Sequence, residues 1–261
     1  MKEIRSRDNP FYKELVKLSG SSRERSKNRQ TLLDGVHLLE AYLDAGGKPL
    51  HMLVNEAASR NEEIGALLER ASAVPVTRLD DRLFAGLSEL KTPGGIIALI
   101  PIPQPGIRLT DSVFALLLED IQDPGNLGSI LRSAAAAGCD AVFLSQGCAD
   151  AWSPRVLRAA MGGHFALSIH EQQDLVVIAE SFDGSLLAAS LQARSTLYEC
   201  DLRGKLAFMI GNEGAGLTGD LLACATGIVA IPMPGRVESL NAAAAAAVCL
   251  FEAVRQRSAV R

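Results

Sequence analysis

The sequence predicts an α/β protein of two domains, a small α/β domain followed by a larger domain built on a mostly parallel sheet. Two observations predict this fold class. Apolar, strand-like runs alternate with helical stretches along most of the 261 residues, a pattern typical of parallel sheets covered by helices. Three prolines fall within residues 101–105 and disfavour both helix and central strand. We therefore expect one domain at 1–100, a linker at 101–109 and a second domain at 110–261.

The first domain is expected to start with a helix at Asn9-Pro10, because proline is tolerated at the first position of a helix. A second helix is expected over Val36–Leu43, and Gly46-Gly47 would end it. The other expected elements are strands at Leu50–Val54, Val74–Thr77 and Ile96–Ile100, and helices near Glu62–Arg70 and Asp80–Leu87.

The second domain shows a more regular alternation of strands and helices. The expected strands are Val113–Leu118, Ala141–Leu144, Leu186–Ala189, Leu206–Ile210 and Ile228–Ile231, with helices at Leu127–Ala137 and from about Asn241 to Gln256. Ligands of parallel sheets bind beyond the carboxyl ends of the strands. The polar segments that follow three of these strands are therefore the candidate functional segments.

Composition argues against several classes of protein. Hydrophobic residues make up 48% and charged residues 21% of the chain, as in ordinary globular proteins. No apolar run reaches the roughly 18 residues of a transmembrane helix, and the charged start is unlike a signal peptide. We therefore expect no membrane association and a cytoplasmic location. The five cysteines are scattered without metal-binding spacing, so we expect reduced thiols and no metal site.

Charge is distributed unevenly along the chain. The net charge is −4, yet the first 30 residues hold nine basic and only four acidic side chains. A basic end on an acidic body indicates a local contact with a polyanion such as RNA. A solvated helical face of mixed charge explains this feature alone equally well.

The first candidate segment is Asp123–Arg132, where a glycine-bearing loop leads into a helix. Arg132 would lean back toward that loop, because helical side chains point toward the N-terminus of their helix. Helix amides and an arginine together can bind an anion such as a phosphate. The alternative is structural: Asn126 caps the helix, and Arg132 pairs with Asp120 or Asp123.

The second and third candidate segments follow later strands. Gly211-Asn212-Glu213-Gly214-Ala215-Gly216 matches neither the dinucleotide fingerprint nor a Walker loop, which argues against a nicotinamide dehydrogenase and a P-loop NTPase. A flexible surface turn is the alternative interpretation of this loop. The third segment runs from Ile231 to Asn241, in which Ser239 and Asn241 are ordinary N-cap candidates for the following helix.

Taken together, the three segments resemble one family. Asn126-x-Gly128-x-x-x-Arg132, the loop Gly211-Asn212-Glu213-Gly214, and Ile231-Pro232-Met233 through Glu238-Ser239-Leu240-Asn241 are similar to the three signature motifs of the SpoU/TrmH RNA methyltransferases, in the family's order. Residues 1–100 resemble the family's small RNA-binding domain, related to ribosomal protein L30e. That second resemblance is carried by Ser6-x-x-Asn9-Pro10, Asp34-Gly35 and Thr92-Pro93-x-Gly95.

The resemblance implies S-adenosylmethionine as cofactor, methylation of a ribose 2′-hydroxyl in RNA, a homodimer, and a trefoil-knotted SPOUT catalytic domain. No periodicity could have predicted the knot. The catalytic residues that the resemblance implies are Arg132 as the catalytic arginine, Asn126 as its support, and the polar residues Glu213, Ser239 and Asn241. The implied cofactor-binding residues are Gly211, Asn212, Gly214, Ile231, Met233 and Leu240. The basic residues expected to bind RNA are Arg23, Arg25, Lys27 and Arg29.

The expected substrate is 23S ribosomal RNA, because the resemblance is greatest to members that act on the large ribosomal subunit. The alternatives are a transfer-RNA 2′-O-methyltransferase and a non-catalytic RNA-binding or ribosome-assembly protein of the same fold. Two positions depart from the family's pattern: Gly94 stands where glutamine is common, and Ala160 where serine often stands. Neither lies in the three motifs, so they bear on substrate choice rather than on catalysis.

Overall fold

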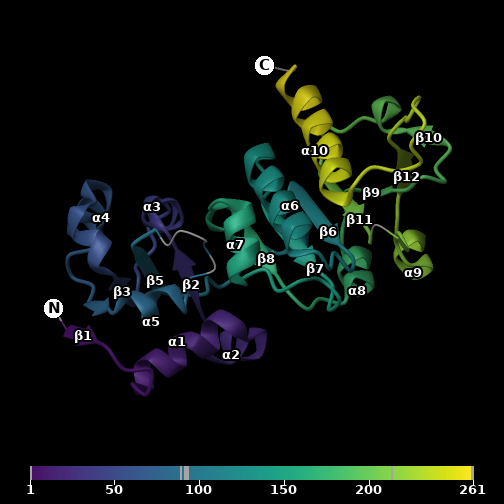
Figure 1. The fold of residues 1–261 in the computed structure, drawn as a ribbon. Coiled ribbons are helices and arrows are strands. Elements are labelled where there is room, and N and C mark those ends of the chain that lie inside the picture. The colour runs from purple at the N-terminus through teal and green to yellow at the C-terminus, as the bar shows by residue number, and fades with distance from the viewer. Residues whose placement is uncertain (1, 89, 91–93, 213, 260–261) are drawn as a thin grey trace. The chain divides into compact units, whose positions relative to one another are not determined.

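The computed structural model describes residues 2–88, 90, 94–212 and 214–259, and the chain divides into two compact units (Figure 1). Unit 1 comprises Met1–Pro103 and Trp152–Phe165, and unit 2 comprises Gln104–Ala151 and Ala166–Arg261. Within the part of the chain that is described, no helix is long and apolar enough to cross a membrane.

Unit 1 is built on a mixed sheet with the strand order β1-β4-β3-β5-β2. Its strands are β1 (Lys2–Ile4), β2 (Gln30–Asp34), β3 (His51–Val54), β4 (Val76–Leu79) and β5 (Ile96–Pro101). Strands β1 and β3 run parallel to β4, whereas β5 runs antiparallel to β2 and β3. The predicted small α/β domain is confirmed in these elements, although β5 extends one residue into the expected linker.

Four of the described helices of unit 1 follow the prediction, and two were not predicted individually. They are α1 (Pro10–Gly20), α2 (Ser22–Asn28), α3 (Val36–Asp44), α4 (Glu62–Arg70), α5 (Asp81–Ala85) and α7 (Pro154–Ala160), with a 3₁₀ turn at Glu56–Arg60 and another at Gly163–Ala166, which extends one residue past the unit boundary. Asn9 caps α1, since its Oδ1 accepts from the backbone N–H of Phe11 and Tyr12. Helix α2 was missed because its sequence contains no apolar residue and so no helical periodicity.

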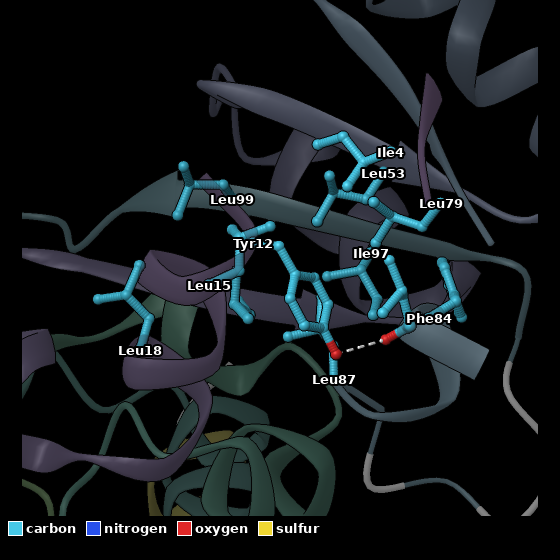
Figure 2. Packing of buried hydrophobic residues seen from close by; sticks show 12 residues of the cluster. Ile4, Tyr12, Leu15, Leu18, Leu53, Leu79, Phe84, Leu87, Ile97 and Leu99 are labelled. Carbon is cyan, nitrogen blue, oxygen red and sulfur yellow. Dashed lines mark hydrogen bonds between the residues drawn. The ribbon is translucent and has the colours of Figure 1, made fainter. Parts of the chain in front are cut away.

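The core of unit 1 forms between the sheet and α1 (Figure 2). Tyr12, Leu15 and Leu18 recur at helical spacing and are all buried. They pack in one cluster with sheet residues such as Leu53. The Tyr12 hydroxyl donates a hydrogen bond to the backbone carbonyl of Leu83 over 3.1 Å, so this buried polar atom is satisfied.

A segment of the expected second domain packs within unit 1. The Thr31 hydroxyl donates to the Trp152 carbonyl over 2.7 Å, and the rings of Tyr42 and Phe165 meet edge-on at 5.1 Å. The chain therefore passes between the units three times, at 103/104, 151/152 and 165/166. Alternation of strands and helices along the sequence does not reveal which sheet a returning segment joins.

Unit 2 is built on a sheet with the order β10-β12-β9-β11-β6-β7-β8, in which every described pairing is parallel. Its strands are β6 (Phe114–Leu118), β7 (Ala141–Leu144), β8 (Ser168–His170), β9 (Ser185–Ala189), β10 (Ser195–Thr196), β11 (Leu206–Ile210) and β12 (Gly227–Ala230). The predicted mostly parallel sheet is confirmed. Only the short strands β8 and β10 were not expected.

Helices cover both faces of this sheet. They are α6 (Pro124–Ala137), α8 (Leu175–Glu180), α9 (Gly219–Ala223) and α10 (Ala242–Ser258), with 3₁₀ turns at Leu109–Asp111 and Leu197–Glu199. Figure 1 shows α6 and α10 side by side, and the two helices are in extensive contact. Residues of α8 and α9 pack with the opposite face in a cluster that includes Leu117 and Met209. Helix α6 begins at Pro124, three residues earlier than predicted.

Leu15→Ala should destabilise unit 1 by about 2–5 kcal/mol, because Leu15 is fully buried and its removal leaves a cavity. Glu14→Ala, at the exposed neighbouring position, should change the free energy of unfolding by less than about 0.5 kcal/mol. Trp152, the single tryptophan of the chain, is buried within unit 1. Its fluorescence in a urea titration therefore reports on this unit, and equal midpoints for the two variants would contradict the assigned core.

Candidate active site

A pocket lies at the carboxyl ends of β9, β11 and β12 in unit 2. Its volume is about 270 Å³, just below the usual range of about 300–1,000 Å³ for small-molecule sites. Its described lining comes from residues 189–192, 210–212 and 214–217, and from several residues between 229 and 245. This is the sheet edge at which ligands of parallel α/β folds bind.

The residues expected to bind a cofactor all line this one pocket: Gly211, Asn212, Gly214, Ile231, Met233 and Leu240. Ser239, one of the expected catalytic residues, lines it as well. None of the described lining residues carries a charged side chain. The pocket therefore offers apolar walls and neutral polar groups, largely of the backbone.

The glycine loop after β11 is held by the amide side chain of Asn212. Its Oδ1 accepts hydrogen bonds from the backbone N–H of Gly214 and Ala215, at 2.8 and 3.1 Å. Its Nδ2 donates to the backbone carbonyl of Asp120 over 3.0 Å. The described residues of the loop thus form a hydrogen-bonded turn.

Gly211 and Gly216 let the backbone of this loop fold back on itself. A Cβ atom at Gly211 would lie 2.3 Å from the carbonyl carbon of Gly216, so only glycine allows the approach. Gly216 has a φ of +72°, in the left-handed region that glycine adopts readily. Glu213, an expected catalytic residue, lies outside the described residues.

Two expected catalytic residues meet at the N-termini of α6 and α10. Asn241 Nδ2 donates to Asn126 Oδ1 over 2.9 Å, although the two residues are 115 positions apart. Asn241 Oδ1 accepts from the backbone N–H of Ala243 and Ala244, so Asn241 also caps α10. Helix α6 is capped by Asp123, whose Oδ1 accepts from the backbone N–H of Asn126. The interpretation of Asn126 as a helix cap is therefore wrong.

Arg132 lies on α6, six residues after Asn126, and is exposed. Six helical residues correspond to about 9 Å along the axis. Arg132 is not among the lining residues of the pocket. Among the described residues it has no hydrogen-bond or ion-pair partner, so the pairing with Asp120 or Asp123 is wrong. Its guanidinium is available for an external anion.

The cysteines offer no reactive thiolate. All five are free, and burial raises the pKa of each thiol, to about 12 for Cys139 and Cys249. A thiol with a raised pKa stays protonated at neutral pH and is a poor nucleophile. Among the described residues there is also no group of three His, Cys, Asp or Glu side chains that could hold a metal ion.

The four basic residues expected to bind RNA differ in their exposure to solvent. Arg23, Lys27 and Arg29 are exposed on α2 and at its C-cap. Arg25 is only 5% exposed, and its guanidinium donates to two carbonyl oxygens at the end of α1, at 2.5 and 3.0 Å. A guanidinium engaged in this way joins α1 to α2, which corrects the expectation that Arg25 contacts RNA.

Sequence reasoning missed the pocket wall formed by residues 189–192 and by Leu217. These residues carry no polar motif, and Leu191 is 62% exposed, so neither chemistry nor burial singles them out. The one available signal is position, because residue 189 ends the predicted strand β9 and residues 190–192 follow it directly.

Comparison with known proteins agrees with this geometry. Residues 113–251 match the SpoU rRNA Methylase family, and residues 9–98 match the MRM3-like substrate binding domain. The 23S rRNA (guanosine(2553)-2′-O)-methyltransferase RlmP of Bacillus subtilis is 33% identical over 96% of this chain and 98% of its own length. The crystal structure of an RNA 2′-O ribose methyltransferase has a TM-score of 0.82 and 32% identity, covering 98% of this chain and 99% of that one. That of an AdoMet-bound rRNA methyltransferase from Sinorhizobium meliloti has a TM-score of 0.84 and 27% identity, covering 97% of each chain.

The parallel sheet, the pocket at its carboxyl edge and the separate substrate-binding domain define an S-adenosylmethionine-dependent methyltransferase. The chain belongs to the SpoU rRNA methylase family. The family resemblance carried by the three sequence motifs is thereby confirmed.

Asn241→Ala should remove both the cap of α10 and the hydrogen bond to Asn126. We expect a loss of about 1 kcal/mol in stability and about a hundredfold lower methylation rate, since small misplacements at a site cost that much. Asn241→Ser retains a capping oxygen but has no amide. Its stability should therefore be nearly normal, while its methylation rate should fall as far as that of Asn241→Ala. Thermal unfolding and single-turnover methylation measure the two effects. A normal rate in Asn241→Ser would contradict this role for the amide.

Proposed function

We propose that this protein methylates a ribose 2′-hydroxyl of 23S ribosomal RNA, with S-adenosylmethionine as the methyl donor. One observation carries the proposal. The expected cofactor residues share one pocket, and the helix that completes its wall begins at Asn241, which is bonded to Asn126 of the first motif. The names of similar proteins, among them RlmP of Bacillus subtilis, support the ribosomal substrate.

The described residues of the pocket fit a nucleoside-based methyl donor. Leu191, Leu217 and Leu240 offer apolar walls to an adenosine moiety. Backbone groups of Gly211 and Ile231 offer hydrogen-bond partners at the same wall. No described lining side chain is cationic, so none repels the positive sulfonium group.

The chemistry needs alignment more than activation. When bound, the cofactor supplies an electrophilic methyl group, and the protein must present the ribose hydroxyl in line with it. Such alignment lowers a barrier by roughly 7–11 kcal/mol in favourable cases. Asn241 holds Asn126 in a fixed orientation at the start of α6. Ser239, on the pocket wall, is proposed to contact the reacting groups.

Arg132 is proposed as an electrostatic group rather than a base. A guanidinium stays protonated at neutral pH, so it has no free site that could accept the proton of a hydroxyl. It is well suited to binding a phosphate and to stabilising the negative charge that develops on the ribose oxygen. The exposure of Arg132 on α6 leaves it accessible to RNA. The catalytic role of Glu213 rests on the family motif alone.

Several features remain predictions from the sequence and the resemblance. These are the homodimer, the trefoil knot, the cytoplasmic location, and the domain division into 1–100, 101–109 and 110–261. Unit 1 is proposed to bind the RNA substrate, because residues 9–98 match a substrate-binding domain. That separate domain favours ribosomal over transfer RNA. Arg132, Ser239 and Asn241 are all present, which disfavours a non-catalytic assembly protein.

Arg132→Ala should lower the methylation rate by about 10²–10³-fold, as for loss of one group that stabilises a developing charge. Arg132→Lys should retain partial activity, because it keeps the positive charge. The measurement is mapping of 2′-O-methyl sites after incubation of unmodified 23S, 16S and transfer RNA with S-adenosylmethionine and each variant.

Arg203→Ala is the matched control for this experiment. Arg203 is likewise an exposed arginine of unit 2 that does not line the pocket, but it pairs with Asp201 and lies outside the three motifs. It should behave as the wild type. Modification of transfer RNA alone would refute the ribosomal substrate, and full activity of Arg132→Ala would refute the catalytic assignment.

The exposed basic residues of α2 should contribute to RNA affinity through phosphate contacts. Reversing the charge of Arg23, Lys27 and Arg29 together should make the slope of log affinity against log salt concentration shallower by up to about 2. Each phosphate contact contributes about 0.7 to that slope on single strands. Reversal of Lys48, Arg60 and Arg82, which are also exposed in unit 1, provides a control of equal charge. Equal slopes for both triple variants would remove α2 from the RNA interface.

A further inference from the structure

Asp120 has an unusual backbone conformation at the edge of the pocket region. It lies two residues beyond the end of β6, with a φ of +55°. Among the described residues, the other non-glycine positions with positive φ are Arg29, Met161 and Gln172. The left-handed conformation is unfavourable for a residue with a Cβ atom, although aspartate tolerates it better than most. Such a conformation persists only where its surroundings enforce it.

The conformation of Asp120 directs its carbonyl group at the glycine loop. That oxygen accepts the hydrogen bond from Asn212 Nδ2 over 3.0 Å, across 92 positions of sequence. Asn212 Oδ1 is then turned toward the backbone N–H of Gly214 and Ala215. The carbonyl of Asp120 thus fixes the amide group that shapes the pocket wall.

Two neighbours hold Asp120 in place. The Ser145 hydroxyl donates to Asp120 Oδ1 over 2.7 Å and accepts from the Asp120 backbone N–H over 2.9 Å. Gly147 leaves room for the carboxylate, since a Cβ atom there would lie 2.1 Å from Asp120 Oδ1. Backbone conformation and side-chain contacts therefore point to the same constraint.

We propose that Asp120 is a positioning residue for the cofactor-binding loop. It does not line the pocket but acts through Asn212, and the essential feature is its left-handed backbone rather than its negative charge. The inference rests on the proposed role of the 211–216 loop as a wall of the S-adenosylmethionine site.

The test is the affinity of the full chain for S-adenosylmethionine, measured by titration calorimetry. Asp120→Ala should weaken binding about tenfold, or about 1.4 kcal/mol, because alanine disfavours the left-handed conformation. Asp120→Gly and Asp120→Asn should stay within about twofold of the wild type, since both residues adopt it readily. Rescue by glycine, which lacks any side chain, would be unexpected if the carboxylate itself were required.

Three further variants separate this role from general stability. Gln172→Ala removes the side chain at a second left-handed position of unit 2, which is exposed, so affinity should be unchanged although stability falls. Gly147→Ala should weaken binding by displacing the Asp120 carboxylate. The double variant Asp120→Gly with Gly147→Ala should bind as well as Asp120→Gly alone, because the clash is gone.

Hydrogen exchange of the cofactor-free protein provides a readout that does not depend on binding. The amides of Gly214 and Ala215 should exchange faster in Asp120→Ala and at the wild-type rate in Asp120→Gly. If the variants show this exchange pattern but the wild-type protein does not bind S-adenosylmethionine, the proposed function is overturned and the positioning role is retained. The positioning role would be overturned if Asp120→Ala matched the wild type in both amide exchange and affinity. It would also be overturned if Asp120→Gly lost as much affinity as Asp120→Ala.

Discussion

In unit 2 every described strand pair is parallel, and the candidate site depends on this constraint. Parallel neighbours require the chain to cross back over the sheet between strands, so all strands end at the same edge. Loops that are far apart in sequence then emerge side by side. The end of β6 lies beside the end of β11 for this reason, and the hydrogen bond between Asn212 and Asp120 joins them. The contact between Asn241 and Asn126 likewise joins residues distant in sequence.

The same architecture supplies rigidity and electrostatic potential. Strands β6, β7 and β11 are buried at every position, so the loops extend from elements that hardly move. The N-termini of α6 and α10 meet at the Asn126–Asn241 contact. Their aligned peptide dipoles both place partial positive charge there. At α6 this charge is met by the Asp123 carboxylate that caps the helix, and at α10 by the side-chain oxygen of Asn241.

Sequence patterns predicted the elements of unit 2 well because β6 and β11 are continuous apolar runs of strand length, and α10 has a clear cap. The expected cofactor residues share one pocket because they lie in segments that follow such strands. Features without a pattern escaped prediction: α2 has no apolar stripe, and the burial of Arg25 depends on where α1 ends. The return of residues 152–165 to unit 1 is a tertiary property, as is the left-handed backbone of Asp120. Neither leaves a periodic signal in the chain.

The polar groups of the site bind one another, and this has a consequence for catalysis. Asn212 satisfies the loop amides and Asn241 satisfies both a helix terminus and Asn126, so these groups are held by hydrogen bonds within the protein. Ordering on binding costs about 0.5–1.5 kcal/mol for each flexible side chain, a cost that this network avoids. Because alignment is the main demand of methyl transfer to a hydroxyl, a network held by the protein's own groups stabilises the transition state more than one assembled by the substrate.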